Sequence, residues 1–153
     1  MYAELKERLK GTIVIACIGN ELKGDDAAGP SLAKALQNKI RAHVINCAEV
    51  PESYTGKIKA LKPDTIVIVD AVHLKAAPGS VSIIEKDKLS EIKLYSTHNV
   101  PLKVFMDYLK IETKADIFLL GIQPSHLAFS NGLSDEVERA VTSLAYIFQK
   151  LLK

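Results

Sequence analysis

The chain has 153 residues, 48% of them hydrophobic, which is enough for one globular domain over residues 1–153 with a full-sized core. Its 20 Lys and Arg residues, against 18 Asp and Glu, form no basic block, so nothing predicts nucleic-acid binding. The longest apolar runs fall far short of the roughly 20 residues that span a bilayer, and the charged first ten residues do not resemble a secretory signal, so we expect a cytoplasmic protein that is not inserted in a membrane.

Strands and helices are predicted to alternate along the first half of the chain. Residues 12–17 are a continuous β-branched and apolar run, which is typical of a strand buried on both faces. Apolar residues then recur at helical spacing over residues 27–40. A short apolar run at 43–47, a second helical segment at 52–61 and a buried-type strand at 65–69 follow. This order predicts a parallel α/β sheet.

The next connection is predicted to reverse the chain. Only residues 71–78 separate the third strand from the apolar run 81–84, and a parallel crossover needs a dozen residues or more. We therefore expect a fourth strand that is antiparallel to the third and lies at the edge of the sheet. A helix over 100–110, a parallel strand over 116–120 and a last helix that begins at Ser134 complete the prediction.

This topology places four features at one edge of the sheet, where the parallel strands end. They are the glycine-rich loop Gly19–Asp26, Asp70 after the third strand, His98 before the third helix, and Gln123 after the fifth strand. Open α/β sheets bind their ligands at this carboxyl edge. The position of His98 depends on the antiparallel assignment of the fourth strand.

The acidic pair Asp25 and Asp26 has two interpretations. One of the two is expected to cap the following helix, since Asp is a favoured cap. A cap at Asp26 would put Pro30 at the fourth helical position, the first at which a missing N–H costs an intrahelical bond. We therefore expect the helix to begin near Ala28 or Gly29, which leaves at least one carboxylate for a function.

Asp70 and His98 also have structural alternatives. Asp70 ends a run of five apolar residues, where an unpaired charge is costly, so it is either a turn residue or a ligand. His98 stands beside Asn99 and Pro101, which are enough to start a helix without it. Two carboxylates and one imidazole suit a divalent transition ion such as nickel, zinc, manganese or iron.

Other histidines and the two cysteines leave choices open. His73 and His126 are alternative imidazoles at the same edge. Cys17 and Cys47 are expected to be small buried hydrophobes, with a soft metal-ligand pair as the alternative. A structural disulfide would be unusual in a reducing compartment.

In order and spacing, four segments resemble those of the hydrogenase maturation endopeptidases, which trim the C-terminal extension from the large subunit of nickel-iron hydrogenases. The segments are Ile18-Gly19-Asn20 with Gly24-Asp25-Asp26, Ile68-Val69-Asp70-Ala71, Thr97-His98-Asn99-Val100-Pro101-Leu102 and Gly121-Ile122-Gln123-Pro124. The resemblance covers nearly the whole chain. It implies an α/β fold, a three-layer α/β/α sandwich around a five-stranded, mostly parallel sheet with one antiparallel edge strand.

The resemblance also implies roles for the residues at the carboxyl edge. Asp26, Asp70 and His98 are expected to contact nickel, which in this family belongs to the hydrogenase precursor. Asp26 and Asp70 are the expected catalytic residues, and Asp25 is a candidate for proton transfer or for a supporting hydrogen bond. The loop-shaping and substrate-binding positions are expected to be Gly19, Asn20, Gly24 and Gln123.

Two other classes of protein share part of this pattern. A nickel-binding maturation chaperone could use the same ligands without hydrolysis. A phosphoacceptor receiver domain also has an acidic pair after its first strand and an aspartate after its third. It further needs a lysine after the fifth strand, and residues 121–124 contain none.

Overall fold

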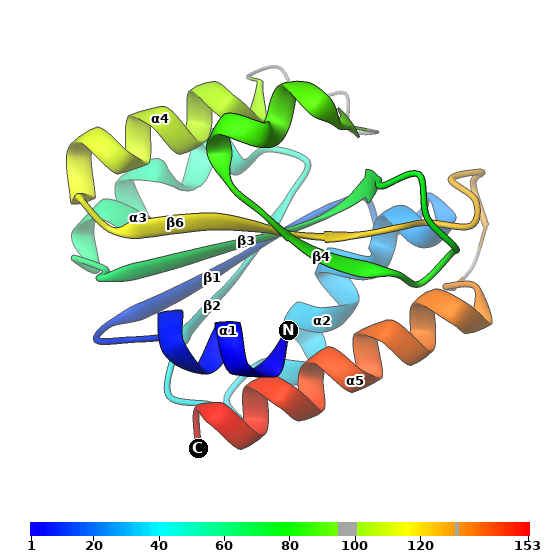
Figure 1. The fold of residues 1–153 in the computed structure, drawn as a ribbon, viewed down its shortest axis with the longest axis horizontal. Coiled ribbons are helices and arrows are strands. Elements are labelled where there is room, and N and C mark those ends of the chain that lie inside the picture. Colours follow the sequence, from blue (N-terminus) through cyan, green and yellow to red (C-terminus); the bar gives the residue numbers. More distant parts are fainter. Residues whose placement is uncertain (95–100, 131) are drawn as a thin grey trace.

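The computed structural model describes residues 1–94, 101–130 and 132–153 (Figure 1). Its strands are β1 (Ile13–Ile18), β2 (His43–Ala48), β3 (Thr65–His73), β4 (Val81–Ile84), β5 (Lys93–Leu94) and β6 (Asp116–Ile122). The main sheet has the order β2-β1-β3-β6-β4, in which β4 is antiparallel to β6 and the other neighbours are parallel. The short strand β5 pairs antiparallel with the end of β3, outside this order.

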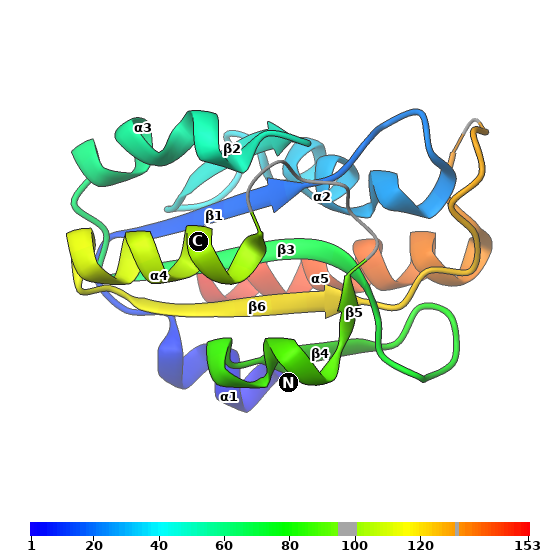
Figure 2. The same cartoon turned by 90° about the horizontal axis from the view of Figure 1, so that it is seen from above.

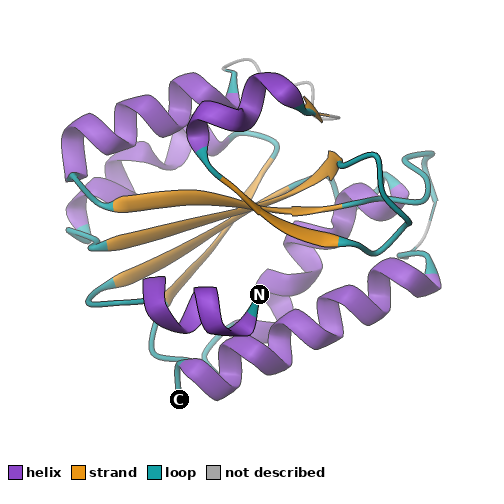
Figure 3. Ribbon diagram, viewed as in Figure 1, coloured by secondary structure: helices purple, strands orange, loops and turns teal. Residues whose placement is uncertain are grey.

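Helices cover both faces of the sheet (Figure 3). The α-helices are α1 (Tyr2–Arg8), α2 (Ala28–Leu36), α3 (Thr55–Ala60), α4 (Leu102–Thr113) and α5 (Asp135–Leu151), and the 3-10 helices are η1 (Gly24–Ala27), η2 (Pro51–Tyr54) and η3 (Lys86–Glu91). Helices α1, α2 and α5 pack on one face, and α3 and α4 on the other. The predicted three-layer α/β/α sandwich with a mostly parallel sheet and one antiparallel edge strand is confirmed.

The two central strands explain why the sheet keeps one register. Every residue of β1 is buried, and so are the first eight of β3. Alternate side chains enter the two cores, so that Ile15 packs with α2 and α5 while Ala16 packs with α3 and α4. A shift by one residue would exchange the two faces, so the strand ends occupy fixed places at the carboxyl edge.

The edge strand β4 runs antiparallel to β6, as expected from the short connection between β3 and β4. In register, Asp70 of β3 lies opposite Gly121 of β6, and Gly121 lies opposite Ser82 of β4. The turn before β4 is fixed to β6 by two backbone hydrogen bonds. Gly79 N–H donates to the Gln123 carbonyl at 2.8 Å, and Gln123 N–H donates to the Ser80 carbonyl at 2.8 Å.

Several boundaries differ from the prediction. The helix predicted over residues 27–40 ends at Leu36, because Gln37 takes an extended ψ of 124° and Asn38 a φ of +62°. The segment predicted as one helix over 52–61 divides into η2 and α3. The strand predicted to end at residue 69 continues to His73, because β5 pairs with its last two residues.

The elements α1, η3 and β5 were not predicted. The helix predicted over residues 100–110 is α4, which begins at Leu102 with Pro101 as its N-cap residue; Asn99, expected to help start this helix, lies outside the described residues. In the part of the chain that the structure describes, no helix is long and apolar enough to cross a membrane.

Candidate active site

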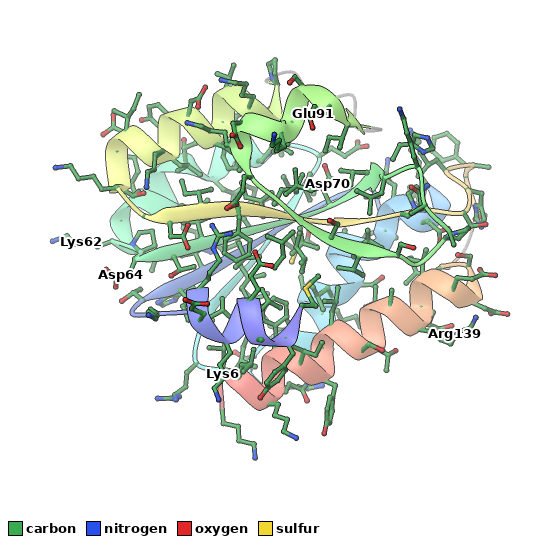
Figure 4. The ribbon with its side chains drawn as sticks, viewed as in Figure 1. Lys6, Lys62, Asp64, Asp70, Glu91 and Arg139 are labelled. Atoms are coloured by element: carbon green, nitrogen blue, oxygen red, sulfur yellow. The ribbon has the colours of Figure 1, made fainter. Side chains whose placement is uncertain are left out.

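The carboxyl edge brings together three of the four features predicted there. The loop after β1, the end of β3 and the segment after β6 lie at the same end of the molecule (Figure 2). The turn η1 contacts β3 directly, so Asp26 and Asp70 come to the same edge. Asp70 lies inside the outline of the molecule, whereas Lys62 and Arg139 extend from its periphery (Figure 4). The fourth feature, His98, lies outside the described residues.

The loop after β1 folds back on Asp26. Gly19 has a φ of +150°, and a Cβ added there would overlap the backbone carbonyl oxygen of Asp26. The next residue, Asn20, donates its backbone N–H to Oδ2 of Asp26 at 2.8 Å. Glycine is therefore required at position 19, because the loop brings this carbonyl against its Cα.

Short polar contacts fix the rest of this loop. The Asn20 side-chain oxygen accepts the N–H of Leu22 at 2.8 Å, a turn that an Asn side chain commonly makes. The N–H of Asp26 donates to the Lys23 carbonyl at 3.0 Å. Gly24 has a φ of +52°, and a Cβ there would lie 2.6 Å from Nδ1 of His126. These contacts agree with the loop-shaping roles expected for Asn20 and Gly24.

Helix α2 begins at Ala28, as the position of Pro30 predicted. Its N-cap residue is Ala27, and the cap position makes no side-chain hydrogen bond. The prediction that Asp25 or Asp26 caps this helix is therefore wrong. Both aspartates lie in η1, the 3-10 turn before the helix, and their oxygens accept hydrogen bonds from other segments.

Asp25 is fully buried, and its carboxylate accepts hydrogen bonds from the segment after β6. Its Oδ2 accepts the N–H of Ser125 at 2.7 Å, the N–H of His126 at 3.2 Å and the hydroxyl of Ser134 at 2.8 Å. Its Oδ1 accepts the N–H of Ser134 at 2.7 Å. Burial alone would raise the pKa of this carboxyl, but the four hydrogen bonds hold the pKa below its ordinary value. Asp25 is therefore a carboxylate at neutral pH.

Asp26 and Asp70 are the other two buried carboxyl groups at this edge, with 4% and 0% of their surface exposed. Asp70 alternates along β3 with Ile68 and Val72, which face α3 and α4, so it points to that face of the sheet. Its Oδ1 accepts the N–H of Ala71 at 2.9 Å. Two buried carboxyl groups at one edge repel each other when both are ionised, so a cation at this edge would stabilise the ionised pair.

The described residues contain part of the predicted metal site. Within residues 1–94, 101–130 and 132–153, no three His, Cys, Asp or Glu side chains could together hold a metal ion. His73 and His126 therefore do not complete a site with Asp26 and Asp70. The imidazole assigned to that site, His98, falls in the stretch that the structure does not describe.

Comparisons with known proteins identify the family. A model of the HycI hydrogenase maturation protease family matches residues 27–150. The chain belongs to the hydrogenase maturation proteases. This protease is 36% identical to the hydrogenase 3 maturation protease of Escherichia coli (strain K12), over 92% of the chain and 88% of that protein. A putative hydrogenase maturation protease of Methanocaldococcus jannaschii is also 36% identical, over 99% of the chain and 98% of that protein.

The fold of this maturation protease agrees with a solved structure of the same family. The crystal structure of a NiFe hydrogenase maturation protease HycI from Thermococcus kodakarensis KOD1 matches with a TM-score of 0.87 and 36% identity, over 97% of this chain and 98% of that one. The family and the endopeptidase activity predicted from the four motifs are thereby confirmed. The receiver-domain alternative is excluded by the same membership.

In this maturation protease, Gln123 connects the segment before β4 to the end of β6. Its side chain is 5% exposed, and its Oε1 accepts the N–H of Leu74 at 2.6 Å. Its Nε2 donates to the Pro124 carbonyl at 3.1 Å and lies 3.4 Å from Nδ1 of His73. Gln123 was expected to bind substrate, and the structure adds these internal contacts.

The partners of Asp25 were missed by sequence reasoning. Ser134 was predicted to begin the last helix; in the structure α5 begins at Asp135, and Ser134 is its N-cap residue. Its hydroxyl, however, donates to Asp25 and makes no helix cap. Ser125 and His126 offer backbone N–H groups, which every sequence contains, so no residue pattern could have indicated them.

The two cysteines of the protease behave as the small hydrophobes that were predicted. Cys17 and Cys47 are free and fully buried, in the cores on opposite faces of the sheet. Burial raises the pKa of both thiols, so neither is a thiolate at neutral pH.

Proposed function

We propose that this protease removes the C-terminal extension from the large-subunit precursor of a nickel-iron hydrogenase, and that it recognises the nickel ion already bound to that precursor. The family supports a hydrogenase as the substrate. The observation that carries the nickel recognition is the pair of buried carboxylates, Asp26 and Asp70, at the carboxyl edge. His98 is proposed as the third contact, on the resemblance of its motif.

The chemistry of these side chains fits such a substrate. Carboxylate and imidazole groups are common ligands of divalent transition ions, and a set of three leaves positions for the ligands of the precursor. Opposite charges in a poorly solvated site have a favourable interaction energy of roughly several kcal/mol. A precursor that carries nickel would gain this energy from Asp26 and Asp70, and a nickel-free precursor would not. The energy difference gives a physical basis for cleaving the loaded precursor alone.

The other proposed roles follow from the loop. Gly19, Asn20 and Gly24 hold Asp26 in place and present the backbone of the loop to the substrate. Gln123 fixes the opposite side of the carboxyl edge. We also infer a cytoplasmic location, which the two free thiols support, because free cysteines are usual in reducing compartments.

The test compares nickel-loaded and nickel-free precursor, each incubated with the protease and followed by the change in mass of the large subunit. We expect cleavage of the loaded precursor only. Equal cleavage of both would remove the nickel-recognition role. Nickel-dependent, stoichiometric binding that leaves the precursor intact would identify a chaperone.

A further inference from the structure

The hydrogen bonds between Asp25 and the segment after β6 run in both directions. The Asp25 carboxylate accepts three backbone N–H groups and the Ser134 hydroxyl, with both of its oxygens in use. In return, the Asp25 N–H donates to the His126 carbonyl at 3.0 Å. Both ends of the segment after β6 are therefore tied to a single residue of η1.

Further contacts extend this connection between the two loops. The Ser130 N–H donates to the Leu22 carbonyl at 3.2 Å, and Lys23 forms a parallel bridge with Ser130. The His126 ring packs against Gly24, with no room there for a Cβ. The loop before η1 and the segment after β6 thus form one unit.

The turn η1 is consequently held from two sides. On the β1 side, the Asp26 carbonyl packs against Gly19 and the Asp26 carboxylate accepts the Asn20 N–H. On the β6 side, Ser125, His126 and Ser134 donate four hydrogen bonds to the Asp25 carboxylate. Because η1 spans only four residues, a shift of Asp25 must also move Asp26.

We propose that Asp25 is a positioning residue, whose carboxylate clamps Ser125, His126 and Ser134 onto η1 and so fixes the place of Asp26 at the carboxyl edge. This inference rests on the proposed function of Asp26. A direct part for Asp25 in proton transfer does not fit its environment, because Oδ2 already accepts three hydrogen bonds and Oδ1 a fourth, all from residues of the protein. The two aspartates would then have different roles: Asp25 would position the site, and Asp26 would face the substrate.

The substitution Asp25→Asn tests the clamp with almost no change in shape. An amide has one oxygen and one NH2 group, so in either orientation its NH2 group faces at least one donor that now lacks an acceptor. The substitution also removes the negative charge at position 25, so the remaining hydrogen bonds to this side chain become weaker. Because Asp26 is then held less firmly, we expect kcat/KM for the nickel-loaded precursor to fall roughly 10- to 100-fold. Backbone amide exchange of Ser125, His126 and Ser134 should become faster.

The matched control is Asp116→Asn in the full-length protein. Asp116 also accepts two side-chain hydrogen bonds, both from Arg8, but it begins β6 at the opposite end of the sheet. This variant should lose thermal stability while it keeps the wild-type cleavage rate and the wild-type amide protection of Ser125, His126 and Ser134. A comparison at a temperature well below both melting points separates positioning from general loss of stability.

Ser134 provides a milder pair of variants in case Asp25→Asn does not fold. Ser134→Ala removes only the hydroxyl bond to Asp25, so it should lower kcat/KM and amide protection in the same direction by a smaller factor. Ser134→Thr keeps a hydroxyl and should restore both. If Ser134→Ala changes neither quantity, the clamp does not position the site.

Three outcomes would overturn or separate the proposals. Lost cleavage with unchanged amide protection in Asp25→Asn would mean that Asp25 acts directly in the reaction. Lost protection with wild-type cleavage would mean that the clamp does not position Asp26. If the wild type cleaves loaded and nickel-free precursor alike, nickel recognition fails, while the comparison of Asp25→Asn with Asp116→Asn still decides the role of the clamp.

Discussion

The backbone carbonyl of Asp26 occupies the space that a side chain at Gly19 would need. The Gly19→Ala variant must therefore move η1, and with it the carboxylate that we place in the site. A clash with backbone atoms in a packed region costs about 1–3 kcal/mol, and the φ of +150° adds strain. We expect a lower free energy of unfolding and a fall in cleavage of nickel-loaded precursor of roughly 100-fold. Chemical denaturation and initial rates measure the two effects.

Gly56→Ala is the control for this variant. Gly56 lies in α3, and nothing lies within 4 Å of a Cβ added there. Cleavage should stay at the wild-type rate. Wild-type cleavage by Gly19→Ala would show instead that the position of Asp26 tolerates movement of the loop.

Connection lengths and burial patterns were enough to predict most of the fold. The apolar runs of β1 and β3 are short and β-branched, as is typical of strands covered on both faces, and the short connection before β4 could not support a parallel crossover. Helix α1 was missed because its anchor is distant in sequence. Arg8 donates from Nε to Asp116 at 2.9 Å and from Nη1 to Glu85 at 2.9 Å, contacts that span 108 and 77 residues.

The candidate site shows the same limit. The glycines at positions 19 and 24 and the acidic pair mark a tight turn after β1, and the structure contains one. Which of the two aspartates has a structural role could not be predicted, because most hydrogen-bond donors to Asp25 are backbone groups and all of them lie about 100 residues away in the sequence. A helix cap was expected because it needs only neighbouring residues. In the structure, Asp25 instead accepts hydrogen bonds from residues far along the chain.

The approach of α2 to β1 gives a prediction on stability alone. Gly29 lies in α2, and a Cβ there would overlap the Ile18 carbonyl, which is backbone and cannot rotate away. Although alanine favours helices, Gly29→Ala should lower the free energy of unfolding by about 1–3 kcal/mol. Gly56→Ala, in open space, should raise it by about 0.5–1 kcal/mol. Denaturant midpoints that move in the same direction for both variants would contradict this account.

The ion pair between Arg8 and Asp116 predicts a pH dependence of stability. Hydrogen bonds and charge attraction from Arg8 hold the pKa of the Asp116 carboxyl below its ordinary value, against the opposing effect of burial. Since the folded-state pKa is the lower one, the stabilisation is complete above the unfolded value of about 3.9 and is lost as the pH falls through the folded value. The difference in melting temperature between wild type and Asp116→Asn should therefore be largest near neutral pH and shrink below about pH 4. A difference that stays constant down to the lowest pH would rule out the charge pair as its source.

The proposed nickel contacts predict a common defect for three separate variants. Asp26→Asn, Asp70→Asn and His98→Gln each remove one proposed ligand. The loss of several kcal/mol of metal interaction should make cleavage of nickel-loaded precursor slower by a factor of roughly 100 or more. The control is His43→Gln, because His43 begins β2 at the end of the sheet away from the site and is exposed. Cleavage rates are compared at equal nickel content of the precursor, with circular dichroism to verify the fold. Wild-type cleavage by His98→Gln would leave Asp26 and Asp70 without the proposed third contact and would remove His98 from the site.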